Sequence, residues 1–346
     1  MSGETVNLYS DTQTRPGEGM RAAIAGAEVG DEQRRRDPTV NRLQERVAEL
    51  LGHEAGLFLP SGTMCNAIAI RLHIRPLGDE MYLHPTAHPV EAEAGGPAAL
   101  AGAMISYLEG EGGMFDGATL RAALRDPSDR HQPRSRLVAV EQSTNMGGGR
   151  VWPLERIEGV LEVARENGMR THLDGARLLN ATAASGVPAA EYAGGFDTAW
   201  LDFSKGLGAP VGACLVGSAE LIEEAWRYKQ MYGGSMRQAG IVAAAALYAL
   251  DHNVERLRED HANARFLADA LAQIEGVQIE PEKVETNLVF FDVADGDALI
   301  AGLAAAGVEM SNEGSRVRAV THLDVDRAGI ERAAEAVAAV LGASGA

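Results

Sequence analysis

Short apolar segments alternate with helix-forming segments between residues 38 and 250, and this alternation constrains the fold more than any other feature. One helix is sharply delimited, because Asp37 can cap it, Pro38 suits its first position and Gly52 can end it. Strands joined by helices form right-handed crossovers, which give a mostly parallel sheet sandwiched by helices. We therefore predict a large α/β domain with seven strands, at residues 55–59, 80–83, 104–108, 136–141, 170–173, 198–203 and 212–216.

The pattern changes near residue 253, where a long amphipathic helix begins. It carries Leu257, Leu267 and Leu271 on one face and ends at Gly276. Further strands are predicted at 277–279, 287–293 and 317–320, and helices at 297–306 and 327–341. The chain is thus predicted to divide into an N-terminal arm (1–20), a large domain (21–250) and a smaller C-terminal α/β domain (251–346).

Composition excludes several classes of protein. The formal net charge of −18 argues against binding to nucleic acid or to anionic membranes, because both require a basic surface. The first residues lack a basic-then-apolar signal pattern, and the longest apolar stretch, 239–250, is too short to cross a bilayer. Cys65 and Cys214 are far apart in apolar contexts, as is typical of buried thiols. We expect a soluble cytoplasmic protein without a metal site.

A lysine and an aspartate follow predicted strands of the large domain. Lys205 comes just after an apolar strand, in a turn punctuated by glycines, where partial desolvation favours a neutral amine. Asp174 follows the apolar end of an earlier strand. In parallel sheets, ligands bind at the carboxyl ends of the strands, where both residues fall. An amine that attacks an aldehyde and a carboxylate that holds a ring nitrogen indicate pyridoxal phosphate (PLP) chemistry. A surface lysine and a helix-capping aspartate are the structural alternatives.

Several segments could hold a phosphate group. The hydroxyls and backbone N–H groups of Ser61-Gly62-Thr63 precede a predicted helix, and a helix N-terminus binds anions. Ser204 stands beside Lys205, and Arg237 follows two consecutive glycines, which permit close approach of the backbone to a ligand. Capped helix starts and plain loops are common, so each segment alone is a weak signal.

Three other residues could bind the cofactor or the substrate. His88 lies in a loop after a strand, and its flat ring could stack on the cofactor and exchange protons near neutral pH. Arg177 and Arg318 could clamp a substrate carboxylate through paired hydrogen bonds. A solvated loop histidine and surface or interdomain ion pairs are the alternatives.

Taken together, these segments resemble the low-specificity threonine aldolase family of PLP enzymes. The resemblance runs in order from residue 7 to about residue 340. It rests on residues 10–16, 37–40, 60–66, 88–96, 141–151, 172–177, 204–212, 233–240, 286–287 and 318–324.

The resemblance implies an aspartate-aminotransferase-like fold and a role for each matching residue. Lys205 would form the Schiff base with the cofactor aldehyde, Asp174 would hold the pyridine nitrogen, and His88 would stack on the ring. The substrate carboxylate would be received by Ser10, Arg177 and Arg318. Gly62, Thr63, Ser204 and Arg237 would belong to the phosphate region. Members of this family form homotetramers, dimers of dimers with shared active sites.

Two departures from the family pattern affect the substrate site. Arg34, within three consecutive arginines, stands where relatives have a tyrosine that approaches the substrate. Thr144 stands where many relatives have a histidine considered a partner of the substrate hydroxyl. The base is therefore His88 or a water that His88 relays. A basic loop at Arg34 favours a substrate with a polar or anionic side chain, unless these arginines pair with the protein's own carboxylates.

The predicted reaction is retro-aldol cleavage of L-threonine, L-allo-threonine and related β-hydroxy amino acids to glycine and an aldehyde. β-Elimination and transfer of a glycyl group to a second aldehyde are alternatives on the same scaffold. A cofactor carrier without catalytic activity is a further alternative, which the combination of Asp174, Lys205 and Arg318 disfavours.

Overall fold

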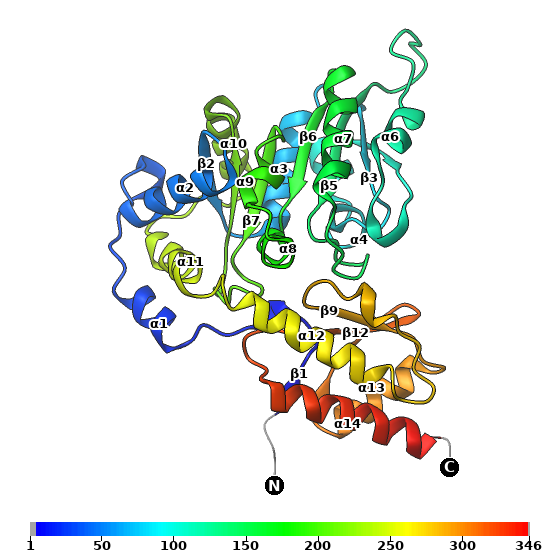
Figure 1. Cartoon of the computed structure of the whole chain (residues 1–346). Coiled ribbons are helices and arrows are strands. Elements are labelled where there is room, and N and C mark those ends of the chain that lie inside the picture. The colour runs from blue at the N-terminus through cyan, green and yellow to red at the C-terminus, as the bar shows by residue number, and fades with distance from the viewer. Residues whose placement is uncertain (1–4, 345–346) are drawn as a thin grey trace.

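The computed structural model describes residues 5–344, which form two α/β domains (Figure 1). The large domain contains a seven-stranded sheet in the order β2-β8-β7-β6-β5-β3-β4. Only β8 runs antiparallel to its neighbours. The predicted strands are confirmed to within one residue at each end. They are β2 Ala55–Leu59, β3 Glu80–Leu83, β4 Met104–Tyr107, β5 Ser135–Glu141, β6 Arg170–Asp174, β7 Thr198–Asp202 and β8 Ala213–Gly217.

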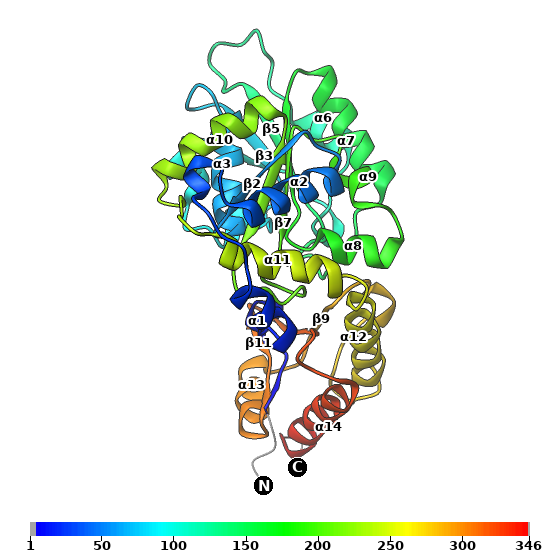
Figure 2. The same ribbon diagram turned by 90° about the vertical axis from the view of Figure 1, so that its left-hand side faces the viewer.

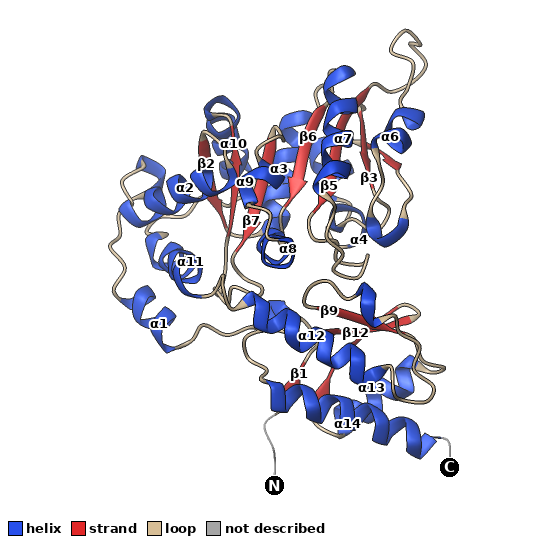
Figure 3. Ribbon diagram, in the orientation of Figure 1, coloured by secondary structure: helices blue, strands red, loops and turns tan. Residues whose placement is uncertain are grey.

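Helices cover both faces of this sheet (Figure 3). On one face, α3 and α10 pack through a cluster that includes Cys65, Trp200 and Leu215. On the other face, α2 and α7 pack through a larger apolar cluster. The helices of this domain are α1 Glu18–Ala25, α2 Pro38–Leu51, α3 Gly62–His73, α4 His88–Glu91, α5 Gly96–Ala101, α6 Gly117–Ala123, α7 Leu154–Glu166, α8 Leu178–Ser185, α9 Ala189–Ala193, α10 Ala219–Met231 and α11 Gly240–His252.

The ends of α2 confirm the predicted boundary residues. The Asp37 carboxylate accepts hydrogen bonds from the backbone N–H groups of Thr39 and Val40, both at 3.1 Å. Pro38 occupies the first helical position, and Gly52 ends the helix with a φ of 73°. A left-handed residue at this place favours glycine, because a side chain would be strained there.

The small domain extends from one end of the large one, as the view in Figure 2 shows. Its three-stranded sheet has the order β11-β12-β9. The arm contributes β1, which pairs with β10, and its Val6 and Leu8 side chains join the apolar core of the small domain. The elements are β1 Val6–Asn7, α12 Leu257–Leu271, β9 Leu288–Phe291, α13 Gly296–Ala305, β10 Val308–Glu309, β11 Ser311–Glu313, β12 Arg316–Val320 and α14 Arg327–Ser344.

The strand predicted at 277–279 is wrong. This segment forms a single bridge, between Gln278 and Asp292. Pro281 follows within three residues and opens a 3-10 helix, Pro281–Lys283. Because proline cannot donate a hydrogen bond to a neighbouring strand, the pairing cannot continue.

Within residues 5–344, no helix combines the length and the apolar character that crossing a membrane requires.

Candidate active site

Three buried carboxylates stand at the ends of neighbouring parallel strands. Glu141 ends β5, Asp174 ends β6 and Asp202 ends β7. Glu141 and Asp174 are direct register partners. This edge of the sheet faces the small domain (Figure 1). Burial raises the pKa of Glu141 to about 7, and the neighbouring charge of Asp174 contributes to that rise.

Lys205 follows β7 and lies at this edge, as predicted. Its side chain is 17% exposed, and its Nζ lies 3.6 Å from Asp202 Oδ2, beyond a good hydrogen bond. Burial raises the pKa of Asp202, and the charge of Lys205 partly offsets that effect. The ammonium also lies 5.9 Å from the centroid of the Trp200 ring. The amine is therefore sheltered from solvent without being fixed by a close acceptor.

Asp174 is held in place by two donors. Its Oδ1 accepts the backbone N–H of Ala176 at 3.0 Å, and its Oδ2 accepts the side-chain amide of Asn66 at 2.8 Å. The next residue, Gly175, packs directly against the backbone of β7. A Cβ at this position would lie 1.9 Å from the Trp200 carbonyl oxygen, so only glycine fits. The carboxylate is thus oriented by groups that leave little freedom.

His88 begins α4 and forms a dyad with Glu93. Its Nδ1 lies 2.8 Å from Glu93 Oε1, and 30% of its side chain is exposed. The hydrogen bond to Glu93 raises the pKa of His88, burial opposes this, and the charges of Asp174 and Lys205 also act on the ring. His88, Asp174 and Lys205 therefore form one electrostatic cluster, as the sequence predicted.

Arg177 is bound to the arm rather than left free. Its Nε and Nη2 donate to the two carboxylate oxygens of Asp11, at 2.8 and 2.7 Å. Burial alone would raise the pKa of Asp11, but the Arg177 guanidinium outweighs it and holds that pKa well below its usual range. Asn287 of the small domain also donates to Asp11. The Nε and Nη2 donors of Arg177 are thus used by Asp11, whereas its Nη1 makes only a long contact with Asn145 Oδ1, at 3.4 Å.

Arg318 approaches the same point from the small domain. Its Nη2 lies 3.0 Å from Glu313, and its buried Nε has no hydrogen-bond partner among the described residues. Asn145 Oδ1 lies between the two guanidinium groups, 3.4 Å from Arg177 Nη1 and 3.5 Å from Arg318 Nη1. A neutral oxygen placed between two cations marks a point where a carboxylate would be bound favourably.

Ser10 and Thr144 lie buried near this point, and each hydroxyl organises the local backbone. Ser10 Oγ accepts the N–H of Thr12 at 3.2 Å. Thr144 Oγ1 accepts the N–H of Arg150 at 3.2 Å and so closes the turn that carries Asn145.

The predicted phosphate segment begins α3. Ser61 caps this helix through the N–H of Met64 at 3.2 Å, and Thr63 lies in the first turn. A Cβ on Gly62 would lie 2.1 Å from Trp200, so close packing explains this glycine. Ser204 donates to Asp202 Oδ1 at 3.0 Å.

Arg34 and Arg237 lie in two segments that are hydrogen-bonded to each other through Glu32, and these segments form a separate lobe. The Glu32 N–H donates to the Arg237 carbonyl at 2.9 Å, and the Arg237 side chain is 65% exposed, 3.5 Å from Asp31. Within residues 5–344, no hydrogen bond or ion pair joins the side chain of either arginine to His88, Glu93, Asp174 or Asp202. The single chain therefore does not bring these two predicted residues to the cluster.

Sequence reasoning missed several residues of the site. Asp11 lies within the matching segment 10–16, but its partner is 166 residues away. Asn66, Glu93 and Asn145 also lie in matching segments, yet no spacing rule indicates which side chains they contact. Their contacts depend on the packing of separate elements.

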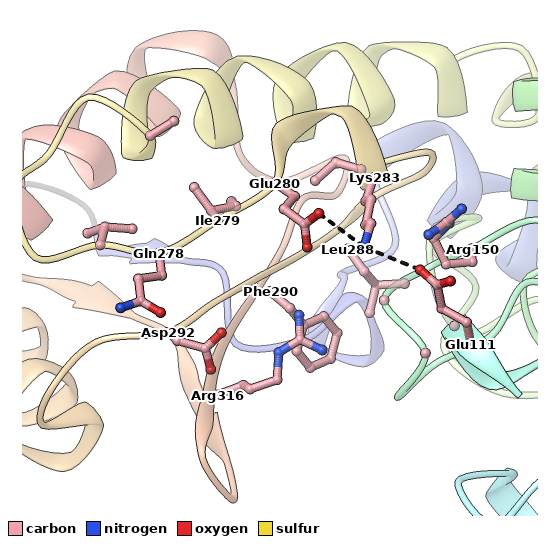
Figure 4. A pocket seen from close by; sticks show the side chains of 16 residues that line it. Glu111, Arg150, Gln278, Ile279, Glu280, Lys283, Leu288, Phe290, Asp292 and Arg316 are labelled. Atoms are coloured by element: carbon pink, nitrogen blue, oxygen red, sulfur yellow. Dashed lines mark ion pairs between the residues drawn. The ribbon is translucent and has the colours of Figure 1, made fainter. Parts of the chain in front are cut away.

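A pocket of about 590 Å³ lies between the domains, on residues outside this cluster (Figure 4). Lys283 bridges Glu280 and Glu111 across it, at 3.0 and 3.2 Å. Nearby, Arg150 Nε donates to Glu285 at 2.6 Å. The Arg150–Glu285 pair joins the turn that carries Asn145 to the small domain, and the Lys283–Glu111 pair joins a second loop of the large domain to it.

The donor set fits PLP. A sheltered amine, a carboxylate fixed by two donors, a partly exposed imidazole and the N-terminus of a twelve-residue helix are the groups that its aldehyde, pyridine nitrogen, ring and phosphate need. The buried Asp202 Oδ2, 3.6 Å from this amine, has no hydrogen-bond partner among the described residues.

Comparisons with known proteins agree with this geometry. A sequence-family model described as beta-eliminating lyase matches residues 7–295. Low-specificity L-threonine aldolase 1 of Arabidopsis thaliana is 40% identical over 326 residues, covering 92% of this chain and 91% of that protein. The low specificity L-threonine aldolase of Escherichia coli (strain K12) is 40% identical over 327 residues, covering 93% and 95%.

A solved structure extends the likeness to the fold. A putative L-allo-threonine aldolase from Listeria monocytogenes superposes with a TM-score of 0.81 at 22% identity, covering 96% of each chain. The chain belongs to the low-specificity L-threonine aldolase family, within the beta-eliminating lyases.

Proposed function

We propose that this protein is a PLP-dependent carbon-carbon lyase that cleaves L-threonine, L-allo-threonine and related β-hydroxy amino acids to glycine and an aldehyde. The observation that carries the proposal is the placement of Lys205, Asp174 and His88 in one cluster at the sheet edge. Arg177 and Arg318 converge beside it. The relatives named above support the same substrate class.

Lys205 would hold the cofactor through its aldehyde carbon, and Asp174 would hold it through the pyridine nitrogen. When bound, PLP supplies an electron sink for the charge left on the substrate as its Cα–Cβ bond breaks. Asp174, whose carboxylate is oriented by Asn66 and the Ala176 N–H, would hold that nitrogen. Gly62, Thr63 and Ser204 would line the phosphate region, and Arg237 would reach it from a neighbouring subunit.

The substrate is oriented by its carboxylate. Arg177 Nη1 and Arg318 Nη1 already share one oxygen acceptor, Asn145 Oδ1, and a carboxylate can replace it. Ser10 lies beside Asp11 and completes this subsite. Binding at this end determines which substrate bond is aligned for cleavage.

His88 is the group best placed to accept the proton of the substrate β-hydroxyl. Because Nδ1 is bound to Glu93, Nε2 is the ring nitrogen without a hydrogen-bond partner among the described residues. A neutral His88 can accept the proton at Nε2 directly or through one water. Thr144, whose hydroxyl closes its own turn, is not needed as a base.

The Glu93→Gln variant tests this role through pH dependence. Glu93 raises the pKa of His88, and the neutral ring is the active form. Losing the negative charge of Glu93 lowers the pKa of His88, so the neutral form persists to lower pH. We expect the acidic limb of kcat/KM to move to lower pH, measured by aldehyde release between pH 5 and 9. An unmoved limb would show that His88 does not accept the proton.

The Arg34→Tyr variant tests whether the enzyme prefers substrates with an anionic side chain. In an assembly with shared sites, the Arg34 lobe would reach the neighbouring site and favour an anionic side chain. We expect Arg34→Tyr to lower the preference for 3-hydroxyaspartate over threonine and phenylserine by about tenfold, because one charged hydrogen bond is lost. Competing-substrate assays measure this ratio, and an unchanged ratio would mean that the arginines serve the protein's own carboxylates.

The same proposal covers assembly and location: a homotetramer with shared sites, in the cytoplasm. The direct test of function is an aldehyde-release assay on a panel of L-β-hydroxy amino acids, with glycine measured in parallel. Equal amounts of glycine and aldehyde support the proposal, and a PLP-loaded protein that releases neither refutes it.

A further inference from the structure

Asn66 lies in α3 and is completely buried against the sheet edge that carries the cluster. Its side chain makes four hydrogen bonds, which is the full capacity of an amide. Nδ2 donates to Asp174 Oδ2 and to Glu93 Oε1, both at 2.8 Å. Oδ1 meets Trp200 Nε1 at 2.8 Å and His172 Nε2 at 3.0 Å.

The indole of Trp200 fixes which way this amide points. Indole nitrogen only donates, so the atom of Asn66 that faces Trp200 must be the oxygen. The amide nitrogen then faces the two carboxylates, which only accept when ionised. The reversed amide would place a donor against a donor and an oxygen against two carboxylates.

The same reasoning fixes which ring nitrogen of His172 carries the proton. Its Nε2 must donate to Asn66 Oδ1, so its Nδ1 accepts from Thr198 Oγ1 at 2.8 Å. Burial lowers the pKa of His172 to about 3, which keeps the ring neutral. Thr198 Oγ1 in turn accepts from His73 Nε2 at 2.9 Å. A chain of hydrogen bonds with fixed donors and acceptors, from His73 through Thr198 to His172, therefore holds the Asn66 amide oxygen in place.

We propose that Asn66 is a positioning residue that couples the two halves of the cofactor site, because one amide nitrogen holds both Asp174 and the Glu93 that orients His88. Glu93 Oε1 accepts from Asn66 and from His88 at once, each at 2.8 Å. The carboxylate for the pyridine nitrogen and the ring that faces the cofactor are thus set by a single side chain. The proposed function is the basis for naming these two halves.

The charged groups around His88 determine in which direction its pKa should change when Asn66 is replaced. Glu93 and Asp174 raise its pKa and Lys205 lowers it, while Glu141 faces it from β5. Without the Asn66 donor, the charge of Glu93 is shared with His88 alone, which strengthens their interaction. Removing Asn66 should therefore raise the pKa of His88, a change that a merely structural role would not produce in this direction.

The test uses Asn66→Leu, of similar volume, and Asn66→Ala, in the PLP-loaded protein with labelled histidine. We expect the NMR pKa of His88 to rise by about half a unit in both variants. We expect kcat to fall about 10- to 100-fold with little change in KM, because Asn66 does not touch the substrate. Both Asn66→Leu and Asn66→Ala are used, so that the test can still be made if one of these variants does not fold.

The matched control is Thr198→Val, which removes the hydroxyl at the far side of His172 but leaves the two carboxylate contacts of Asn66 intact. The pKa of His88 should be unchanged in this variant. A His88 pKa that stays constant or falls in both Asn66 variants would overturn the coupling. Because the titration needs no turnover, it stands apart from the outcome of the aldehyde assay.

Discussion

Replacing Lys205 by alanine is expected to lower the rate of aldehyde release by about 1,000-fold or more, because the amine proposed to bond the cofactor is lost. The chain contains only three lysines, Lys205, Lys229 and Lys283. The ammonium of Lys229 is buried between Glu32 and the Phe58 carbonyl, at 2.9 and 2.8 Å. Lys283 lies at the surface, paired with Glu280 and Glu111. Lys205 alone lies beside Asp174 and His88.

Borohydride reduction followed by peptide mass analysis measures the attachment directly. The cofactor should be found on the peptide that contains Lys205 and should be absent in Lys205→Ala. The control is Lys283→Ala, which should retain both the attachment and the activity. Attachment to Lys229 or Lys283 in the unaltered protein would contradict the assignment.

Replacing Lys229 by methionine is expected to lower the free energy of unfolding by about 3–5 kcal/mol, because the Glu32 charge is left buried and uncompensated. Both side chains of this ion pair are fully buried. Glu32 also accepts the N–H of Met236, so the pair fixes the lobe that carries Arg34 and Arg237. The loss should therefore also loosen that lobe.

Urea unfolding of matched variants separates this effect from ordinary surface charge. Arg121→Ala breaks an exposed ion pair with Glu166 and should cost less than about 1 kcal/mol. Adding Glu32→Gln to Lys229→Met should recover part of the loss, because the buried charge is removed. Equal effects of Lys229→Met and Arg121→Ala would contradict a buried ion pair of this strength.

The sequence predicted the large domain closely, because its signals are local. Apolar runs mark the strands, and Asp37, Pro38 and Gly52 delimit α2 through contacts within a few residues. The segment 277–279 has the same apolar character but lacks a partner beyond one bridge. Strand pairing is decided by neighbours far along the chain, which a local pattern does not contain.

The difference between local signals and contacts over long sequence distances also explains which site residues could be predicted. Lys205, Asp174 and His88 could be predicted because each ends or follows a strand, and the carboxyl ends of parallel strands meet at one edge of the sheet. The bond of Arg177 to Asp11 could not, because it joins the arm to the large domain. The phosphate role proposed for Arg237 has no local support either, since within the described residues its ion pair is with Asp31.

The fate of L-threonine tests the central claim most directly. The PLP-loaded protein is incubated with labelled L-threonine, and the products are followed by carbon NMR. Cleavage directed by Lys205, Asp174 and the two arginines predicts glycine and acetaldehyde in equal amounts. Formation of 2-oxobutanoate and ammonia would instead show β-elimination and contradict the proposed reaction.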